Sequence, residues 1–287
     1  MARRFKKRES IEIGLRRLAT REVGAALAAL ERHRDGPAEG VHRARVACKR
    51  IRAWLALVEA GMDTAEGEAE AFKQAAKRTS GQRDLVAIRL ALSDLAGDRP
   101  ELASPAAWAD GQLITMSTES DMDGQAAMHA MLVDAGARIS GWCVEGGPEA
   151  IIRQGVERGY AAARSAFFGW RDDHRIEHAH VWRKATKRLM YQLDILKRIG
   201  PKNARRTARR LRRLSELLGE HRDLELAKDA VRAMPDDQRR QALLEAIEDA
   251  QTLLGAKAER RGLRLFGVKR KRFARRTLPR RLKLRTI

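Results

Sequence analysis

The stretch HRARVACKRIR, from His42 to Arg52, decides the fold because it returns at His180 as HVWRKATKRLM. In both copies, Arg and Lys follow the His by three and seven residues, and a further Arg follows by eight. A second segment, RDL, recurs in the same order at Arg83 and at Arg222. Two motifs repeated in one order at nearly one separation indicate a tandem duplication.

The polar side chains of the first copy form a stripe when the stretch is placed on a helix. Four of them fall within about 80° of one another: His42, Arg45, Lys49 and Arg52. The neighbouring stripe is apolar and contains Ala44, Cys48, Ile51 and Leu55. Cations beside the core face predict a charged groove between packed helices. The alternative is a solvated helix surface whose cations form ion pairs with Asp and Glu.

The H-x-x-R-x-x-x-K-R segments, each followed by RDL, resemble the CHAD family, the conserved histidine α-helical domain, over residues 10–266. The resemblance implies an all-α fold of two tandem, pseudo-symmetric four-helix bundles with a basic groove or cavity between them. It also implies non-enzymatic binding of inorganic polyphosphate, and hence association with polyphosphate granules. The stripes and the resemblance together nominate ten binding residues: His42, Arg45, Lys49, Arg50, Arg52, His180, Arg183, Lys187, Arg188 and Tyr191.

The two copies are not equivalent. Met190 stands where the first copy has Arg52, so the second stripe lacks one cation. Arg50 and Arg188 lie about 80° from the His of their own copy and are weaker candidates for contact. Nearby cations should keep the imidazoles of His42 and His180 neutral at pH 7 until phosphate binds. The alternative role for each His is a structural hydrogen bond at the start of its helix.

The formal charge of +21 points to a polyanionic partner, and most of it lies in the termini. Residues 1–8 carry five cations and no acid, and residues 257–287 carry fourteen cations and one acid. The rest of the chain is nearly balanced. This distribution keeps open a second function, a nucleic-acid-binding protein that uses its basic termini on a helical scaffold.

Other functional classes lack their sequence signals. We find no glycine-rich phosphate loop, nucleophile elbow or pair of catalytic carboxylates, so we expect no enzyme and no cofactor. His174, His178 and His180 could suggest a metal site, but His180 points away from His178 on a helix. No apolar run is long enough to span a bilayer, and no secretory signal opens the chain. Cys48 and Cys143 are expected to be core thiols, and the protein cytoplasmic.

Helical periodicity predicts eight helices. We expect them at residues 10–33, 41–60, 66–95 with a bend at Gly81, 125–142, 150–170, 174–198, 202–233 and 237–265. The stretch up to Asp123 is expected to be a long loop. The predicted organisation is a basic arm at 1–8, a first half at 9–147, a second half at 148–266 and a basic tail at 267–287. We expect the arm and the tail to be disordered. The oligomeric state is open.

Overall fold

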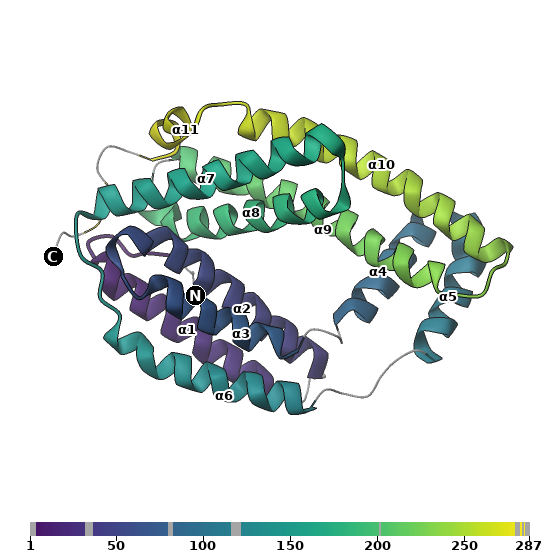
Figure 1. Ribbon diagram of the computed structural model, residues 1–287, viewed down its shortest axis with the longest axis horizontal. Helices are drawn as coiled ribbons and strands as arrows, with labels where there is room; N and C mark the ends of the chain where they lie inside the picture. The colour runs from purple at the N-terminus through teal and green to yellow at the C-terminus, as the bar shows by residue number, and fades with distance from the viewer. Residues whose placement is uncertain are drawn as a thin grey trace. The chain divides into compact units, whose positions relative to one another are not determined.

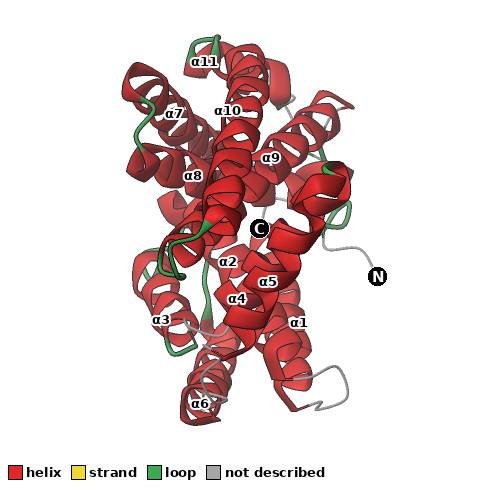
Figure 2. Cartoon of the chain, turned by 90° about the vertical axis from the view of Figure 1, so that its right-hand side faces the viewer, coloured by secondary structure: helices red, strands yellow, loops and turns green. Residues whose placement is uncertain are grey.

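The computed structural model describes residues 4–31, 37–79, 83–115, 122–200, 202–278, 282 and 284. Every regular element in these ranges is a helix (Figure 1, Figure 2), which confirms the predicted all-α class. The chain divides into two compact units, one of residues 1–80, 121–213 and 263–287, the other of residues 81–120 and 214–262. Each unit therefore draws on both halves of the sequence. The boundary at residues 147 and 148 stays a prediction.

The first unit holds the repeated motifs. Its complete α-helices are α1 (Ile11–Glu31), α2 (Pro37–Val58), α3 (Ala65–Lys77), α6 (Met122–Arg138), α7 (Pro148–Asp173), α8 (Ile176–Ile195) and α11 (Arg270–Thr277). Short 3₁₀ turns follow α2, α6 and α8 at Glu59–Gly61, Ile139–Gly141 and Leu196–Arg198. The unit also contains the start of α9 (Lys202–Arg232) and the end of α10 (Gln238–Phe266).

Helix α2 is the centre of the first unit. It packs against α1 and α3, both of which pack against α6, and its other neighbours are α7 and α8 (Figure 1). The residues that face these neighbours are apolar: Ala44, Cys48, Ile51, Trp54 and Leu55 are at most 1% exposed. Burial of such a set against several helices, rather than the intrinsic preference for helix, is what stabilises α2.

Helices α7 and α2 approach each other closely in the first unit. A Cβ atom added to Gly155 of α7 would overlap the backbone carbonyl of Leu57. Only a residue without a Cβ atom permits this contact between backbones. One helical turn later, Gly159 leaves room for the side-chain amide of Gln192 on α8. Gly155 therefore sets how close α7 lies to α2, and Gly159 accommodates a buried side chain of α8.

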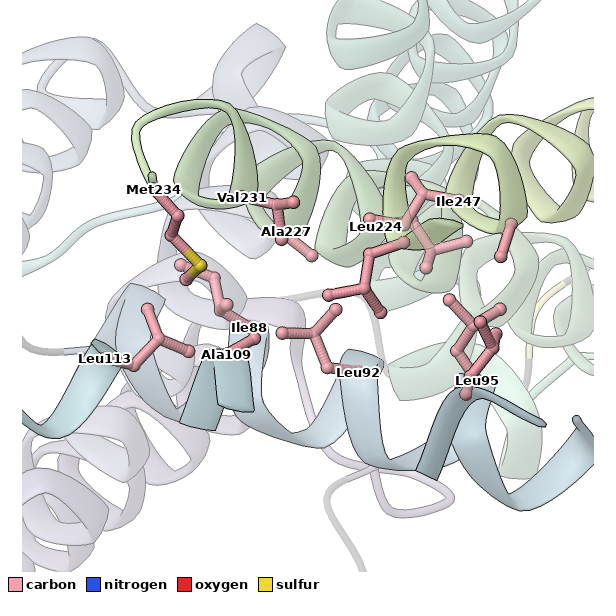
Figure 3. Packing of buried hydrophobic residues seen from close by; sticks show 13 residues of the cluster. Ile88, Leu92, Leu95, Ala109, Leu113, Leu224, Ala227, Val231, Met234 and Ile247 are labelled. Carbon is pink, nitrogen blue, oxygen red and sulfur yellow. The ribbon is translucent and has the colours of Figure 1, made fainter. Parts of the chain in front are cut away.

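The second unit contains α4 (Arg83–Asp98), α5 (Ala103–Thr115) and the larger parts of α9 and α10, and the 3₁₀ turn Pro100–Leu102 joins α4 to α5. Its core is shown in Figure 3, where Ile88 and Leu92 of α4 point toward Ala227 and Val231 of α9. Leu113 of α5 joins the same cluster. Peripheral polar contacts include the ion pair between Lys228 and Glu248, 2.8 Å apart.

The structure corrects two predicted elements near the middle of the chain. The helix expected at 66–95 is two helices, α3 and α4, and the expected bend at Gly81 lies outside the described residues. The expected long loop contains α5, whose buried residues Ala106, Ala109 and Leu113 follow a helical period. Pro105 did not prevent this helix, because it lies in the first turn, where a backbone N–H has no partner within the helix.

The described parts of the two basic termini, residues 4–8 and 267–278, also differ from the expected disorder. The N–H of Phe5 donates to the carbonyl of Ile195 at 3.0 Å, and the Phe5 side chain is fully buried. In the expected tail, α11 packs against α7, with Phe273 stacked on Tyr160 at 3.8 Å between ring centres. A buried aromatic side chain fixes each basic segment to the first unit.

The boundary between α7 and α8 differs from the expected one. Helix α7 continues to Asp173, and His174 ends it in a left-handed conformation with φ of 52°. Helix α8 begins at Ile176, two residues after His174. His174 therefore caps α7 and is not the first residue of the motif helix.

Candidate functional site

The nominated residues of the first copy lie along α2, at the border between core and solvent. All five of them are partly buried: His42, Arg45, Lys49, Arg50 and Arg52. The Arg45 guanidinium donates from Nη1 to the carbonyl of Thr79 at 2.5 Å, which joins α2 to the turn that follows α3. This hydrogen bond fixes the direction of the Arg45 side chain.

The second copy lies along α8 in a similar setting. His180, Arg183 and Lys187 are partly buried, Arg188 is exposed and Tyr191 is 8% exposed. The apolar side of α8 includes Trp182 and Leu189, both fully buried. Met190, which replaces the cation found at Arg52, is also buried, so it adds to the core.

Helix α2 packs against α8, and some nominated residues of the two copies lie close together there. The Arg50 guanidinium lies 5.8 Å from the centre of the Tyr191 ring, within the range of a cation–π contact. Burial lowers the pKa of Arg52, and the positive charge of Arg188 lowers it further. The structure thus brings Arg50 and Arg52 of α2 together with Arg188 and Tyr191 of α8, which lie at least 136 residues later in the sequence. For the other six nominated residues, it establishes the position on their own helix.

The pKa of Tyr191 reflects the burial and the charges at this junction. Burial raises the pKa of its hydroxyl, and the positive charge of Arg50 is the largest opposing effect. Arg212 and Arg183 also lower the pKa of Tyr191, whereas Asp194 raises it. Three guanidinium groups, from α2, α8 and α9, therefore act on the pKa of one hydroxyl.

Two carboxylates position some of these cations. Oε2 of Glu22 on α1 lies 3.0 Å from Nη1 of Arg50, and the Glu22 side chain is only 3% exposed. Oδ2 of Asp194 lies 2.5 Å from Nη2 of Arg212, and Oδ1 lies 2.6 Å from Nζ of Lys197. Sequence reasoning did not find Glu22, which lies 28 residues before its partner on another helix.

Cys48 lies beneath the α2 stripe. Burial raises the pKa of its thiol to about 12, although the nearby charges of Arg52, Arg45 and Lys49 act in the opposite direction. The thiol is fully buried, as expected, whereas Cys143 is exposed, which corrects its assignment to the core. Cys143 lies between buried Trp142 and Val144, so it faces the opposite way, toward solvent.

The repeated RDL segments lie outside this junction. Arg222 and Asp223 are partly buried in the part of α9 that belongs to the second unit. The backbone of Arg83 and Asp84 starts α4, and their side chains lie outside the described residues.

In the described part of the chain, no group of three or more His, Cys, Asp or Glu side chains could hold a metal ion. His178, one of the three clustered histidines, pairs with Asp173 through Nδ1 at 2.8 Å. Among the helices of the described ranges, none has the length and hydropathy to cross a membrane.

The junction of α2 and α8 has the chemistry of an anion-binding surface. Guanidinium groups offer paired N–H donors that match the oxygens of a phosphate, and ammonium groups offer a compact charge. Partial burial strengthens each electrostatic contact relative to one made in bulk water. A multiply charged anion would reduce the repulsion between Arg52 and Arg188.

Comparisons with known proteins agree with this fold. The model of the CHAD domain family matches residues 17–232. The crystal structure of the CHAD domain from the plant Ricinus communis is similar, with a TM-score of 0.54 and 19% identity, covering 91% of this chain and 94% of that chain. No curated protein matches the chain. Because the family model spans well over half of the sequence, from the first helix to the end of α9, the chain belongs to the CHAD domain family.

Proposed function

We propose that the protein binds inorganic polyphosphate along the cationic stripes of α2 and α8, without catalysing a reaction. The observation that carries the proposal is the packing of the two motif helices against each other, with Arg50 of α2 lying 5.8 Å from the Tyr191 ring of α8. The charge of Arg188, which lowers the pKa of Arg52, supports it. The CHAD family is associated with polyphosphate binding, and its namesake histidines correspond to His42 and His180. The proposal includes association with polyphosphate granules in the cytoplasm.

A linear polyanion fits the arrangement better than a single phosphate ion does. Each stripe covers several turns of its helix, so its cations can contact successive phosphoryl groups of one strand. Each Lys or Arg contact also releases counterions from the polyanion, which makes the affinity depend on salt. Polyphosphate offers no base or sugar, and the stripes consist of charged donors suited to its oxygens.

The carboxylates of the site have a positioning role in this proposal. Glu22 holds Arg50 beside Tyr191, and Asp194 holds Arg212 and Lys197. Such contacts fix the guanidinium groups before the ligand arrives, so less side-chain entropy is lost on binding. Each carboxylate also repels a polyanion, which limits the affinity at the positions that it occupies.

The test is a calorimetric titration of the full chain with long-chain polyphosphate. The test variant replaces three stripe cations by alanine, in Lys49→Ala, Arg52→Ala and Lys187→Ala. At about 1 kcal/mol per charged contact, the three substitutions should cost about 3 kcal/mol, which is about 100-fold in affinity. Orthophosphate release is followed in the same samples with Mg²⁺, and none is expected.

A control variant removes the same charge elsewhere, in Arg232→Ala, Lys257→Ala and Arg260→Ala. These three side chains are exposed on α9 and α10, so the affinity should change by less than about threefold. If both variants lose the same affinity, net charge rather than the α2–α8 junction is responsible. Steady release of orthophosphate would overturn the non-enzymatic part of the proposal.

A further inference from the structure

A second basic surface lies on α11, outside the residues that match the family model. The helix has the sequence RKRFARRT and follows Lys269. All six cations of this segment are exposed: Lys269, Arg270, Lys271, Arg272, Arg275 and Arg276. Within the described residues, none of the six forms an ion pair, and residues 260–287 contain no acid.

The cations of α11 are displayed on a fixed helix. Phe273 stacks on Tyr160 of α7 with an angle of 12° between the ring planes, and Ala274 and Thr277 are buried beside it. The Tyr160 hydroxyl lies 2.7 Å from the carbonyl of Val268, to which it donates, at the start of the segment. Docking on one side leaves Lys271 and Arg275 in one outward row and Arg272 and Arg276 in the next.

The start of α9 extends this surface. The side-chain amide of Asn203 donates to the carbonyl of Arg276 at 3.1 Å, so the two helices touch at this point. Arg206 and Arg210 follow Asn203 on the same side of α9, and both are exposed. The basic surface is therefore two helices wide and belongs entirely to the first unit.

We infer that this surface, the α11 face, binds the phosphate backbone of duplex nucleic acid without reading its sequence. Its exposed side chains are Arg and Lys, which contact phosphates, and its one aromatic side chain, Phe273, is buried and cannot stack on a base. A duplex is broad, rigid and carries about one charge per 1.7 Å, so it can contact several rows of cations at once. A thin single strand would engage one row. This site is separate from the polyphosphate site proposed on α2 and α8.

The experiment measures binding of a duplex of about 20 base pairs of arbitrary sequence over a salt series. The test variant is Lys271→Ala, Arg272→Ala, Arg275→Ala and Arg276→Ala, which keeps Phe273 and favours helix. We expect about 100-fold weaker duplex binding, and a salt slope smaller by about 3 to 4, at about 0.9 per lost phosphate contact. The variant Arg272→Lys, Arg275→Lys and Arg276→Lys keeps the charge and should bind within about threefold of the unmodified chain.

The controls separate this inference from the proposed polyphosphate site. A charge-matched variant, Lys77→Ala, Arg232→Ala, Lys257→Ala and Arg260→Ala, should keep most of the duplex affinity. The α2–α8 variant should also keep it, and the α11 variant should keep the affinity for polyphosphate. Unchanged duplex binding by the α11 variant, or an equal loss in the charge-matched variant, overturns the inference. If the α11 variant loses affinity only for polyphosphate, duplex nucleic acid is not the ligand of this face. The same conclusion follows if the unmodified chain binds a single strand more tightly than the duplex.

Discussion

The guanidinium of Arg50 lies 3.0 Å from the Glu22 carboxylate and 5.8 Å from the centre of the Tyr191 ring. A single side chain of α2 thus contacts α1 on one side and α8 on the other. Glu22 is almost fully buried, so its charge depends on partners within the protein. Arg50 is therefore a structural residue of the site as well as a candidate ligand.

Replacing Arg50 by Met should destabilise the protein by about 2 to 4 kcal/mol, because it removes a cation from beside a buried carboxylate. The double variant Arg50→Met with Glu22→Gln should recover part of this loss, since no buried charge then remains at Glu22. Urea unfolding of the four members of this cycle gives the coupling energy, expected to be about 1 to 3 kcal/mol. Additive effects of the two substitutions would show that the ion pair does not contribute.

Substituting Gly155 by Ala should destabilise the protein by about 1 to 3 kcal/mol or more, because the new methyl group overlaps the Leu57 carbonyl and must push α7 away from α2. Polyphosphate affinity should fall as well, since α7 also packs against α8. Gly24 of α1 is the matched control, because a Cβ atom there meets nothing within 4 Å. Gly24→Ala should stabilise the protein by about 0.5 to 1 kcal/mol. Thermal unfolding of both variants tests the contrast.

The two cysteines should differ in reactivity toward a thiol reagent. Cys143 is exposed and should react in the native protein, slowly because a hydrogen bond with Glu12 raises the pKa of its thiol. Cys48 should react only after unfolding, because burial excludes the reagent and raises its pKa to about 12. The folded Cys143→Ser variant should therefore show almost no reaction with the thiol reagent. Rapid labelling of that variant would mean that the α2 core opens readily.

His221 should make the second unit less stable in acid. Burial lowers the pKa of its imidazole below the ordinary value of 6.5, although Glu225 acts in the opposite direction. The unfolded chain then binds a proton that the folded chain does not, so stability is fully present above about pH 6.5 and declines as pH falls below it. His221→Gln should lose less stability between pH 7.5 and pH 5.5. An identical loss in both proteins would exclude His221 as the cause.

The sequence predicted the long helices well, because their apolar residues follow a regular period. The sequence did not indicate α5, because two prolines and several small residues interrupt the helical period of its three buried leucine and alanine residues. The sequence did not indicate α11, because its buried side consists only of Phe273, Ala274 and Thr277. The residue against which Phe273 packs, Tyr160, lies more than 100 residues earlier. A short docked helix cannot be recognised without its docking surface.

The candidate site was partly accessible to the same reasoning. Helical spacing correctly set the cationic stripe of α2 beside its apolar face, since the cations are half-buried and Ala44, Cys48 and Ile51 are fully buried. The contacts between Arg50 and Tyr191, and between Arg50 and Glu22, depend on how three helices pack. Residue spacing within one helix contains no information about contacts between helices. The sequence pattern therefore did not indicate that Glu22 belongs to the site.

The backbone contact between Gly155 and Leu57 bears on the kinetics of ligand capture. Two helices in such contact cannot slide past each other without losing it, so the motif helix α2 is held against α7 before the ligand arrives. Association should then be limited by diffusion and electrostatic steering, and its rate should fall steeply as ionic strength rises.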